Sequence, residues 1–314
     1  DKTGQVVWEG LVSGFGAHMY NLASSPRVTN TQFLGGAARS GVSMFNTGGW
    51  EQARDTGISD YARDAAPVVV NSVFLGARPE SSGDAGSAVV LNDAYGTFTN
   101  GTFVGNQSNE AGSAIRANWS QQQGPANGQT RITNCIFEAN DPPDESLSFT
   151  GLAAPADVSY SVVPGANPYP GTDNLNVQAG FVAAPNVGGT LEWVNDSMVS
   201  VYNDPLFTEL RDANQNWTPG AFAGLYVQLG ASPWGVYLLA NNTADTLVVY
   251  GVAFPGPYLL VDLRLDAQSE CIDSGDDAAP ERLATDLTRT TWADAPGLGK
   301  PGVVTDRGAH EYVP

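Results

Sequence analysis

Three carboxylates near the C-terminal end of the chain are the side chains best suited to hold a metal ion. Asp273, Asp276 and Asp277 lie within five residues, and Asp286 and Asp306 could fold back towards them. Calcium takes six to eight oxygen ligands and is held by loops of this kind, although this spacing does not match an EF-hand. The alternative is that these side chains cap turns in an acidic tail. We therefore expect either no cofactor or calcium.

Residues for acid–base or nucleophilic catalysis are scarce. The two histidines, His18 and His310, belong to no triad motif, and we expect them to be packing or surface residues. A polysaccharide lyase needs a basic residue to remove a proton, yet the chain has only two lysines. A glycoside hydrolase needs paired carboxylates, and the one adjacent pair, Asp276–Asp277, lies outside the repeats. We predict no catalytic residue and favour a protein that is not an enzyme.

Composition restricts the partners. The chain has 314 residues with 33 acidic and 14 basic side chains, so its formal net charge is −19. Such a surface repels phosphate backbones, which excludes a nucleic-acid partner. No run approaches the ~20 apolar residues that span a bilayer. The chain opens at Asp1 without a leader, and we expect a processed mature chain or an excised domain.

Two kinds of residue could carry covalent modification. Cys135 and Cys271 are too few for a disulfide framework, and the sequence leaves open whether they pair or remain buried thiols. The triplet Asn-x-Ser/Thr accepts N-linked glycans in secreted proteins, but it also arises by chance in a chain rich in Asn, Ser and Thr. The candidate glycan acceptors are Asn100, Asn106, Asn118, Asn195, Asn216 and Asn241.

The elements that position these residues follow from an internal repeat. A six-residue word with a central Asn and a final Phe occurs four times, with the Asn positions 41, 29 and 34 residues apart. Each copy is β-branched or aromatic and is bounded by Gly, Asn, Ser or Pro, which is typical of a strand between turns. No segment shows a sustained helical period. The copies are 28–33, 69–74, 98–103 and 132–137.

Repeats of two or three short strands without helices predict an all-β solenoid. Alternate strand residues face inward, so Phe33, Phe74, Phe103 and Phe137 should stack from coil to coil about 4.8 Å apart. The Asn before each strand should lie at a bend, because Asn tolerates a left-handed backbone and can bond the neighbouring coil. We expect the coils to occupy 1–165. Residues 166–265 should hold exit loops and a β-subdomain with four strands between Trp217 and Asp262, and 266–314 an irregular closing segment packed on the last coils.

Five phrases carry a family resemblance: Gly16–Asn21, Ser24–Asn30, Asn203–Phe207, Ser269–Asp276 and Gly308–Tyr312. They resemble motifs of secreted bacterial right-handed parallel β-helix repeat proteins, a group related to the repeats of polymorphic outer-membrane proteins. The resemblance implies a right-handed parallel β-helix with a C-terminal β-rich subdomain, and an extracellular or cell-surface location. Members are mostly surface or secreted proteins, with polysaccharide-degrading relatives on the same fold. The usual double glycine before the second strand is degraded here.

The ends of such a helix expose unpaired backbone groups that invite another chain. The sequence is strand-like from Gln5 to Trp8 and shows no capping helix. We therefore expect an extracellular structural or adhesive module whose partner is another copy, giving a filament, or an upstream domain. The alternative is that residues 1–10 themselves cover this end of the helix. A second class of function is a carbohydrate-active enzyme or carbohydrate-binding module, which a cleft lined by Trp50, Trp119 or Trp217 beside carboxylates would favour.

Overall fold

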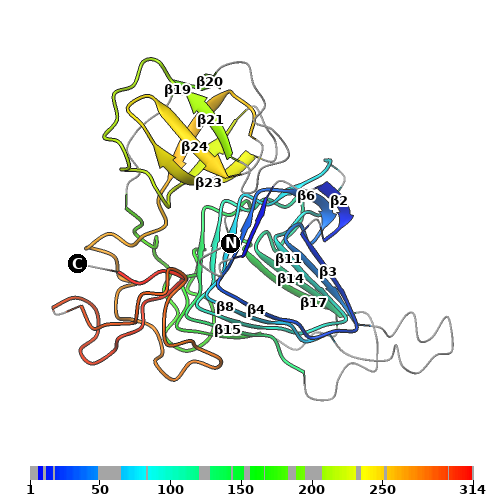
Figure 1. Ribbon diagram of the computed structural model, residues 1–314. Helices are drawn as coiled ribbons and strands as arrows, with labels where there is room; N and C mark the ends of the chain where they lie inside the picture. The colour runs from blue at the N-terminus through cyan, green and yellow to red at the C-terminus, as the bar shows by residue number, and fades with distance from the viewer. Residues whose placement is uncertain are drawn as a thin grey trace. The chain divides into compact units, whose positions relative to one another are not determined.

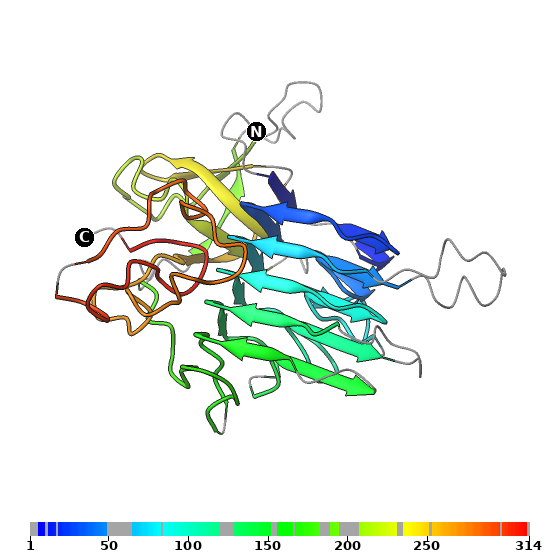
Figure 2. The same ribbon diagram turned by 90° about the horizontal axis from the view of Figure 1, so that it is seen from below.

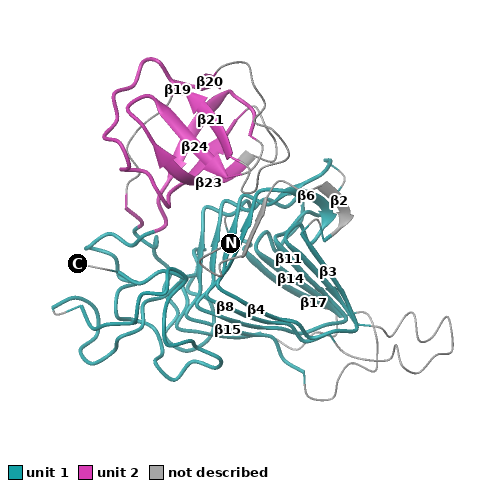
Figure 3. Cartoon of the chain, viewed as in Figure 1, with its two compact units in different colours: residues 1–180, 264–314 teal, residues 181–263 magenta. Residues whose placement is uncertain are grey.

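All regular secondary structure that the structure describes is β. It is a computed structural model, and it contains 25 strands and no helix in the described part of the chain. Two compact units result (Figure 3): Asp1–Gly180 with Arg264–Pro314, and Phe181–Leu263. The all-β prediction is confirmed. The described residues are 6–9, 12–16, 18–48, 65–82, 84–119, 128–142, 144–151, 156–165, 167–182, 189–194, 207–230, 235–250, 253–295 and 297–312.

The first unit consists of stacked parallel sheets (Figures 1 and 2). Sheet A contains β1 (Val6–Glu9), β5 (Thr31–Leu34), β9 (Val73–Leu75), β13 (Thr102–Val104) and β16 (Ile136–Glu138). Sheet B contains β2 (Val12–Phe15), β6 (Ala37–Ser40) and β10 (Arg78–Pro79). Sheet C contains β3 (Met19–Leu22), β7 (Met44–Thr47), β11 (Val89–Asn92), β14 (Ile115–Trp119) and β17 (Leu147–Gly151). Sheet D contains β4 (Arg27–Thr29), β8 (Val68–Val70), β12 (Thr97–Thr99), β15 (Arg131–Thr133) and β18 (Asp157–Ser159).

The chain visits these sheets in a repeating order, A, B, C and D, so each coil adds one parallel strand to a sheet. In the part of the chain that the structure describes, the later coils have no strand in sheet B. The coil arrangement explains why the repeated words lie so far apart in sequence, since a whole coil separates two strands that are hydrogen-bonded neighbours.

The predicted phenylalanine column is confirmed. Phe33, Phe74, Phe103 and Phe137 are fully buried, and successive rings stack with centroids 4.7, 4.5 and 4.9 Å apart. These separations match the spacing between neighbouring strands, because each ring comes from the same register position of sheet A. Each buried ring contributes on the order of 2 kcal/mol through the apolar area that it removes from water.

The recurring asparagines form the bend between sheets D and A. Asn30, Asn71, Asn100 and Asn134 have φ angles of 50°, 48°, 52° and 56°, the left-handed conformation expected for them. The Asn71 amide donates to Asn30 Oδ1 at 3.3 Å, so one rung of the predicted ladder between coils is present. Asn100 and Asn134 instead bond the chain that returns from the second unit.

That returning chain is the closing segment, residues 266–312 of the described chain. Asn100 donates to the carbonyl of Asp306 at 3.2 Å and Asn134 to that of Asp276 at 3.1 Å. Gly308 has a φ of 93° and lies so close to sheet A that a Cβ there would come within 2.8 Å of Ile136. The closing segment thus covers the asparagine bend, and it has no strand of its own within the described residues.

The second unit is a seven-stranded antiparallel sheet with its own core. The four strands expected between Trp217 and Asp262 are present, and three further strands join them. Buried leucine, valine and aromatic side chains lie on one face, and the strands Phe207–Arg211, Thr246–Tyr250 and Pro257–Val261 alternate between buried and accessible positions. In spatial order the strands are β19 (Gly189–Thr190), β25 (Pro257–Val261), β22 (Tyr226–Leu229), β23 (Gly235–Asn242), β24 (Thr246–Tyr250), β21 (Phe207–Arg211) and β20 (Glu192–Trp193).

Residues 166–180, which the sequence placed with the exit loops, belong to the first unit. They follow the last coil because Ser159 bridges Thr172 and Val162 bridges Leu175, both in parallel. Tyr169 packs, partly buried, against the core of the coils.

Candidate functional site

Sheet C has an open edge at each end of the coil stack. Within the described residues, β3 bonds only β7 and β17 bonds only β14, so one side of each strand is unpaired (Figure 2). Sheets A and D differ at the end near β17, because residues 162, 172 and 175 extend them by isolated bridges. The unpaired amides and carbonyls of β3 and β17 are therefore the backbone groups available to another strand.

Tyr20 marks one of these edges on the outer face of sheet C. Its ring stacks on Phe45 with centroids 5.6 Å apart and planes 7° apart, and half of the residue, 50%, is exposed. Tyr20 belongs to the terminal strand β3, so one face of its ring is covered by the next coil and the other is not. At the opposite edge, the same register position is occupied by Ser148.

Charged residues of opposite sign end one outer column of sheet D. Arg27 begins the column, Asp157 ends it, and both are exposed. The guanidinium of Arg27 also forms an ion pair with Glu281 of the closing segment. The sequence analysis did not identify Arg27 and Asp157 as the ends of this column. Each directly precedes the buried Val of its strand, so an alignment of the repeated words would have revealed them.

The carboxylates predicted to hold calcium do not converge. Asp273 is buried and accepts from the Ala295 amide at 2.8 Å, whereas the Asp276 carboxylate accepts from the Ala278 amide at 2.9 Å. The Asp277 carboxylate accepts from the Thr305 hydroxyl at 2.6 Å. Among the described residues, no group of three or more His, Cys, Asp or Glu side chains is arranged to hold a metal ion.

A cluster of buried carboxylates lies in the closing segment. Asp286 and Asp306 fold back towards Asp273 as expected, whereas Glu311 was not predicted to join them. Burial, together with the nearby charges of Asp273 and Asp286, raises the pKa of Asp306 to about 7 against the effect of two backbone hydrogen bonds. Burial and the charge of Asp306 raise the pKa of Glu311 to about 8. The Glu311 amide donates to Asp286 at 3.0 Å, so these side chains fasten the closing segment to itself.

The remaining polar candidates are packing residues. His18 is buried with its ring edge-on to Phe33 at 5.9 Å, and burial lowers its pKa to about 4, so it is neutral near pH 7. His310 is also buried. Cys135 and Cys271 are free and buried, and burial raises the pKa of each thiol to about 12. The question of their pairing is resolved, since no disulfide joins them.

The tryptophan cleft is not found at the described positions. Trp119 and Trp217 are 7% and 8% exposed, each within its own unit, and Trp50 lies outside the described residues.

The candidate glycan acceptors differ in how exposed they are. Asn100 and Asn106 are fully buried and bonded, which leaves no room for a glycan on the folded chain, and Asn118 is partly buried. Asn216 and Asn241 are exposed, and Asn195 lies outside the described residues.

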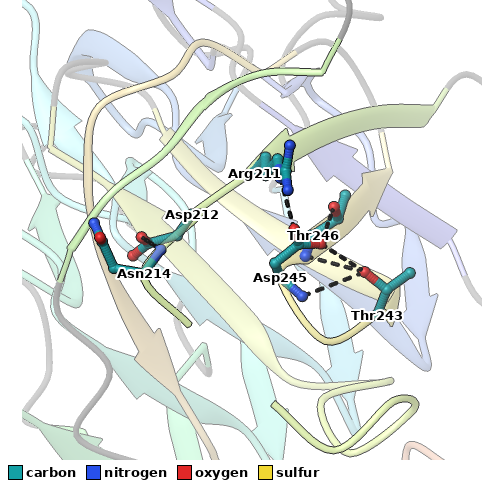
Figure 4. Close-up of polar contacts among 6 residues, drawn as sticks. All are labelled: Arg211, Asp212, Asn214, Thr243, Asp245 and Thr246. Atoms are coloured by element: carbon teal, nitrogen blue, oxygen red, sulfur yellow. Dashed lines mark hydrogen bonds and ion pairs between the residues drawn. The ribbon is translucent and has the colours of Figure 1, made fainter. Parts of the chain in front are cut away.

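The second unit presents an aromatic and polar face on β21 and β24. Phe207 and Tyr250 are cross-strand neighbours with ring centroids 5.1 Å apart, and Tyr250 is 37% exposed. At the other end of the same strand pair, Arg211 donates to Asp245 at 2.6 Å, and this interaction lowers the pKa of Asp245 (Figure 4).

Threonine side chains hold that ion pair in place (Figure 4). The hydroxyls of Thr243 and Thr246 donate to Asp245 Oδ1 at 3.3 and 3.1 Å. Asp212 directly follows Arg211, but its buried carboxylate accepts from Asn214 and from the hydroxyl of Tyr258. Arg211, the last residue of β21, thus serves the surface and the residue that follows it, Asp212, serves the core. Among the described residues of this face, no nucleophile lies beside a base.

No family model, curated protein or solved structure matches the chain. The resemblance to β-helix repeat proteins therefore remains a prediction. Within the part of the chain that the structure describes, no helix is long and apolar enough to cross a membrane.

Proposed function

We propose that the chain is an extracellular structural or adhesive module, a right-handed parallel β-helix that joins copies of itself head to tail into filaments. The observation that carries the proposal is that, among the described residues, sheet C has an unpaired edge at both ends of the coil stack. An exposed parallel edge is a template for another strand, and a contact between opposite ends propagates instead of closing. A repeat module of this kind needs no catalytic group.

The charge of the chain supports an exposed role. A net charge of −19 keeps separate copies soluble and opposes nonspecific association. Specific pairing must then overcome general repulsion, so the joint has to supply directional contacts such as strand hydrogen bonds. Calcium, if it acts, would reduce that repulsion as a counterion between acidic surfaces.

The test is negative-stain electron microscopy of the purified chain at two concentrations about a hundredfold apart, each with and without calcium. We expect rods whose length grows with concentration, because the joint is intermolecular. Uniform single particles under all four conditions would contradict the proposal. Rods in calcium alone would show that repulsion between copies limits assembly.

A second candidate is binding of a neutral carbohydrate by the second unit. It rests on Phe207 and Tyr250, which place an accessible aromatic surface beside hydrogen-bonding side chains on one sheet face. Aromatic rings present an apolar surface against which the faces of sugar rings can stack. Exposed Glu209 lies on the same face between them and the Arg211–Asp245 pair, which disfavours an anionic sugar.

Affinity electrophoresis in gels containing neutral polysaccharides tests this candidate. We expect Tyr250→Ala to weaken retardation about tenfold, equivalent to about 1.4 kcal/mol. Phe254→Ala is the matched control, since it removes an exposed aromatic ring that packs on Trp193 instead. Equal loss in both variants, or no retardation of the unmodified chain by any gel, would exclude this use of the face.

A further inference from the structure

We infer that the outer face of β21 and β24 binds an extended, uncharged glycan lengthwise, with the sugar chain running along the strands from the Phe207–Tyr250 pair to Arg211. This inference rests on the second candidate function and deepens it, because it names the class of ligand and the residues that contact successive sugars. All of these residues belong to the second unit.

Three cross-strand pairs make up this face. The side chains that alternate with the buried ones point outward from β21 and β24, and each pair takes one residue from each strand. Successive pairs are two residues apart, about 7 Å, so the face is about 13 Å long and exceeds a single sugar ring. In order along β21, the pairs are Phe207 with Tyr250, Glu209 with Val248, and Arg211 with Thr246.

The three pairs offer different contacts to a ligand. The rings of Phe207 and Tyr250 present an apolar surface, and Tyr250 is 37% exposed. The exposed carboxylate of Glu209 accepts hydrogen bonds beside the partly buried Val248. The guanidinium of Arg211 donates hydrogen bonds and accepts none. A ligand that contacts all three pairs therefore needs an apolar side and groups that both donate and accept.

Arg211 is held in place with its terminal amino groups unused. Its Nε donates to Asp245 Oδ2 at 2.6 Å, and the hydroxyls of Thr243 and Thr246 donate to the other oxygen of that carboxylate (Figure 4). In the described part of the chain, the terminal amino groups of Arg211 bond no acceptor, and 55% of its side chain is exposed. Asp245 is thus a positioning residue that leaves these amino groups to a ligand.

The charges on the face favour an uncharged polymer. Glu192 lies across from Arg211 on β20, so Glu192, Glu209 and Asp245 face a single basic side chain. This excess of carboxylates repels an anionic polymer, whereas a polymer with a cation on every unit would be repelled by Arg211 at one end. Sugar hydroxyls are uncharged, they both donate and accept, and they surround apolar ring faces, so an uncharged glycan suits all three pairs.

Oligosaccharides of increasing length test this arrangement. The affinity is measured by isothermal titration calorimetry of the full chain with cello-oligosaccharides and manno-oligosaccharides, which are extended, from the disaccharide to the pentasaccharide. We expect the affinity in at least one series to rise about tenfold with length, because only the longer chains reach Arg211. Malto-oligosaccharides, which curve away from a straight strand, should gain no affinity as they lengthen.

Substitutions at the two ends of the face should depend differently on chain length. Tyr250→Ala should weaken binding of every length equally, because each chain uses the aromatic pair. Arg211→Ala should leave the disaccharide unchanged and lower the affinity of the pentasaccharide about tenfold. Asp245→Asn, which releases the guanidinium, and Glu209→Gln should lower the affinity of the long chains alone. Glu80→Gln removes the same charge from an exposed position of the first unit and is the control.

The outcomes separate this arrangement from carbohydrate binding itself. Affinity that is independent of length, or an Arg211→Ala variant that weakens disaccharide and pentasaccharide alike, would overturn the lengthwise arrangement and leave binding at the aromatic pair standing. Retardation by a polysaccharide gel without binding of either extended series would overturn the class of ligand. Neither retardation nor binding of any oligosaccharide would overturn both proposals, and a gain with length that Arg211→Ala removes would support both.

Discussion

At the scale of single residues, asparagine at the bend combines a backbone conformation with a side-chain contact. Asn134 has a φ of 56°, and its side chain both donates to the Asp276 carbonyl and accepts from the Asp276 amide at 2.7 Å. Most residues with a Cβ are disfavoured in this conformation by about 1–2 kcal/mol. Asn and Asp tolerate it, and Gly, which has no Cβ, adopts it readily. The same residue therefore turns the coil and anchors the closing segment.

These two roles can be separated by substitution. Asn134→Gly keeps the conformation and loses the hydrogen bonds, so we expect the free energy of unfolding to fall by about 1–2 kcal/mol. Asn134→Ala loses both, and we expect a fall of about 2–4 kcal/mol. Urea unfolding measures the difference, with exposed Asn167→Ala as the control. A glycine variant as damaged as the alanine variant would contradict the conformational role.

The sequence predicted the coil residues well because identical side chains recur at positions that must stack. The phenylalanine column and the asparagines at the bend can be predicted from the local spacing of the repeats alone. The contacts of Asn71, Asn100 and Asn134 with residues up to 214 positions away do not, since nothing local indicates where an irregular segment returns. For the same reason, sequence proximity suggested that Asp273, Asp276 and Asp277 act together, whereas Asp276 caps its own turn and Asp273 and Asp277 bond Ala295 and Thr305, which are distant in sequence.

At the scale of elements, the closing segment carries a pH dependence. Glu311 and Asp306 have folded pKa values of about 8 and about 7, whereas unfolded carboxyls titrate near 4. The folded state therefore binds more protons than the unfolded state between these values. The stability that the protonated carboxyls contribute is complete below about pH 4 and is lost as the pH rises through about 7 to 8.

Thermal unfolding between pH 5 and 9 tests that sign. We expect the melting temperature to fall as the pH rises, and Glu311→Gln to reduce the fall, because it removes the charge that burial disfavours. Glu270→Gln removes the same charge from an exposed position of the closing segment, so it controls for general repulsion. If both variants follow the unmodified chain equally, the buried carboxyl is not the source of the dependence.

At the scale of the whole molecule, a stack of coils differs from an ordinary domain because nothing in the geometry of a coil prevents a further strand from adding to its sheets. Each strand of sheet C pairs with its neighbours in the same way, so termination has to come from something that covers β3 and β17. The bridges of residues 162, 172 and 175 extend sheets A and D and leave the edge of sheet C unpaired within the described residues. This difference between sheets makes the edge of sheet C the place where the proposed assembly would begin.

Hydrogen–deuterium exchange at two protein concentrations is the most direct measurement of this claim. If copies join through sheet C, peptides covering 19–22 and 147–151 will exchange more slowly at the higher concentration, because the joint protects their outward amides. The central strand β11, residues 89–92, is already paired on both sides and will exchange alike at both concentrations. Edge strands that exchange at the same rate at both concentrations would contradict assembly through this sheet.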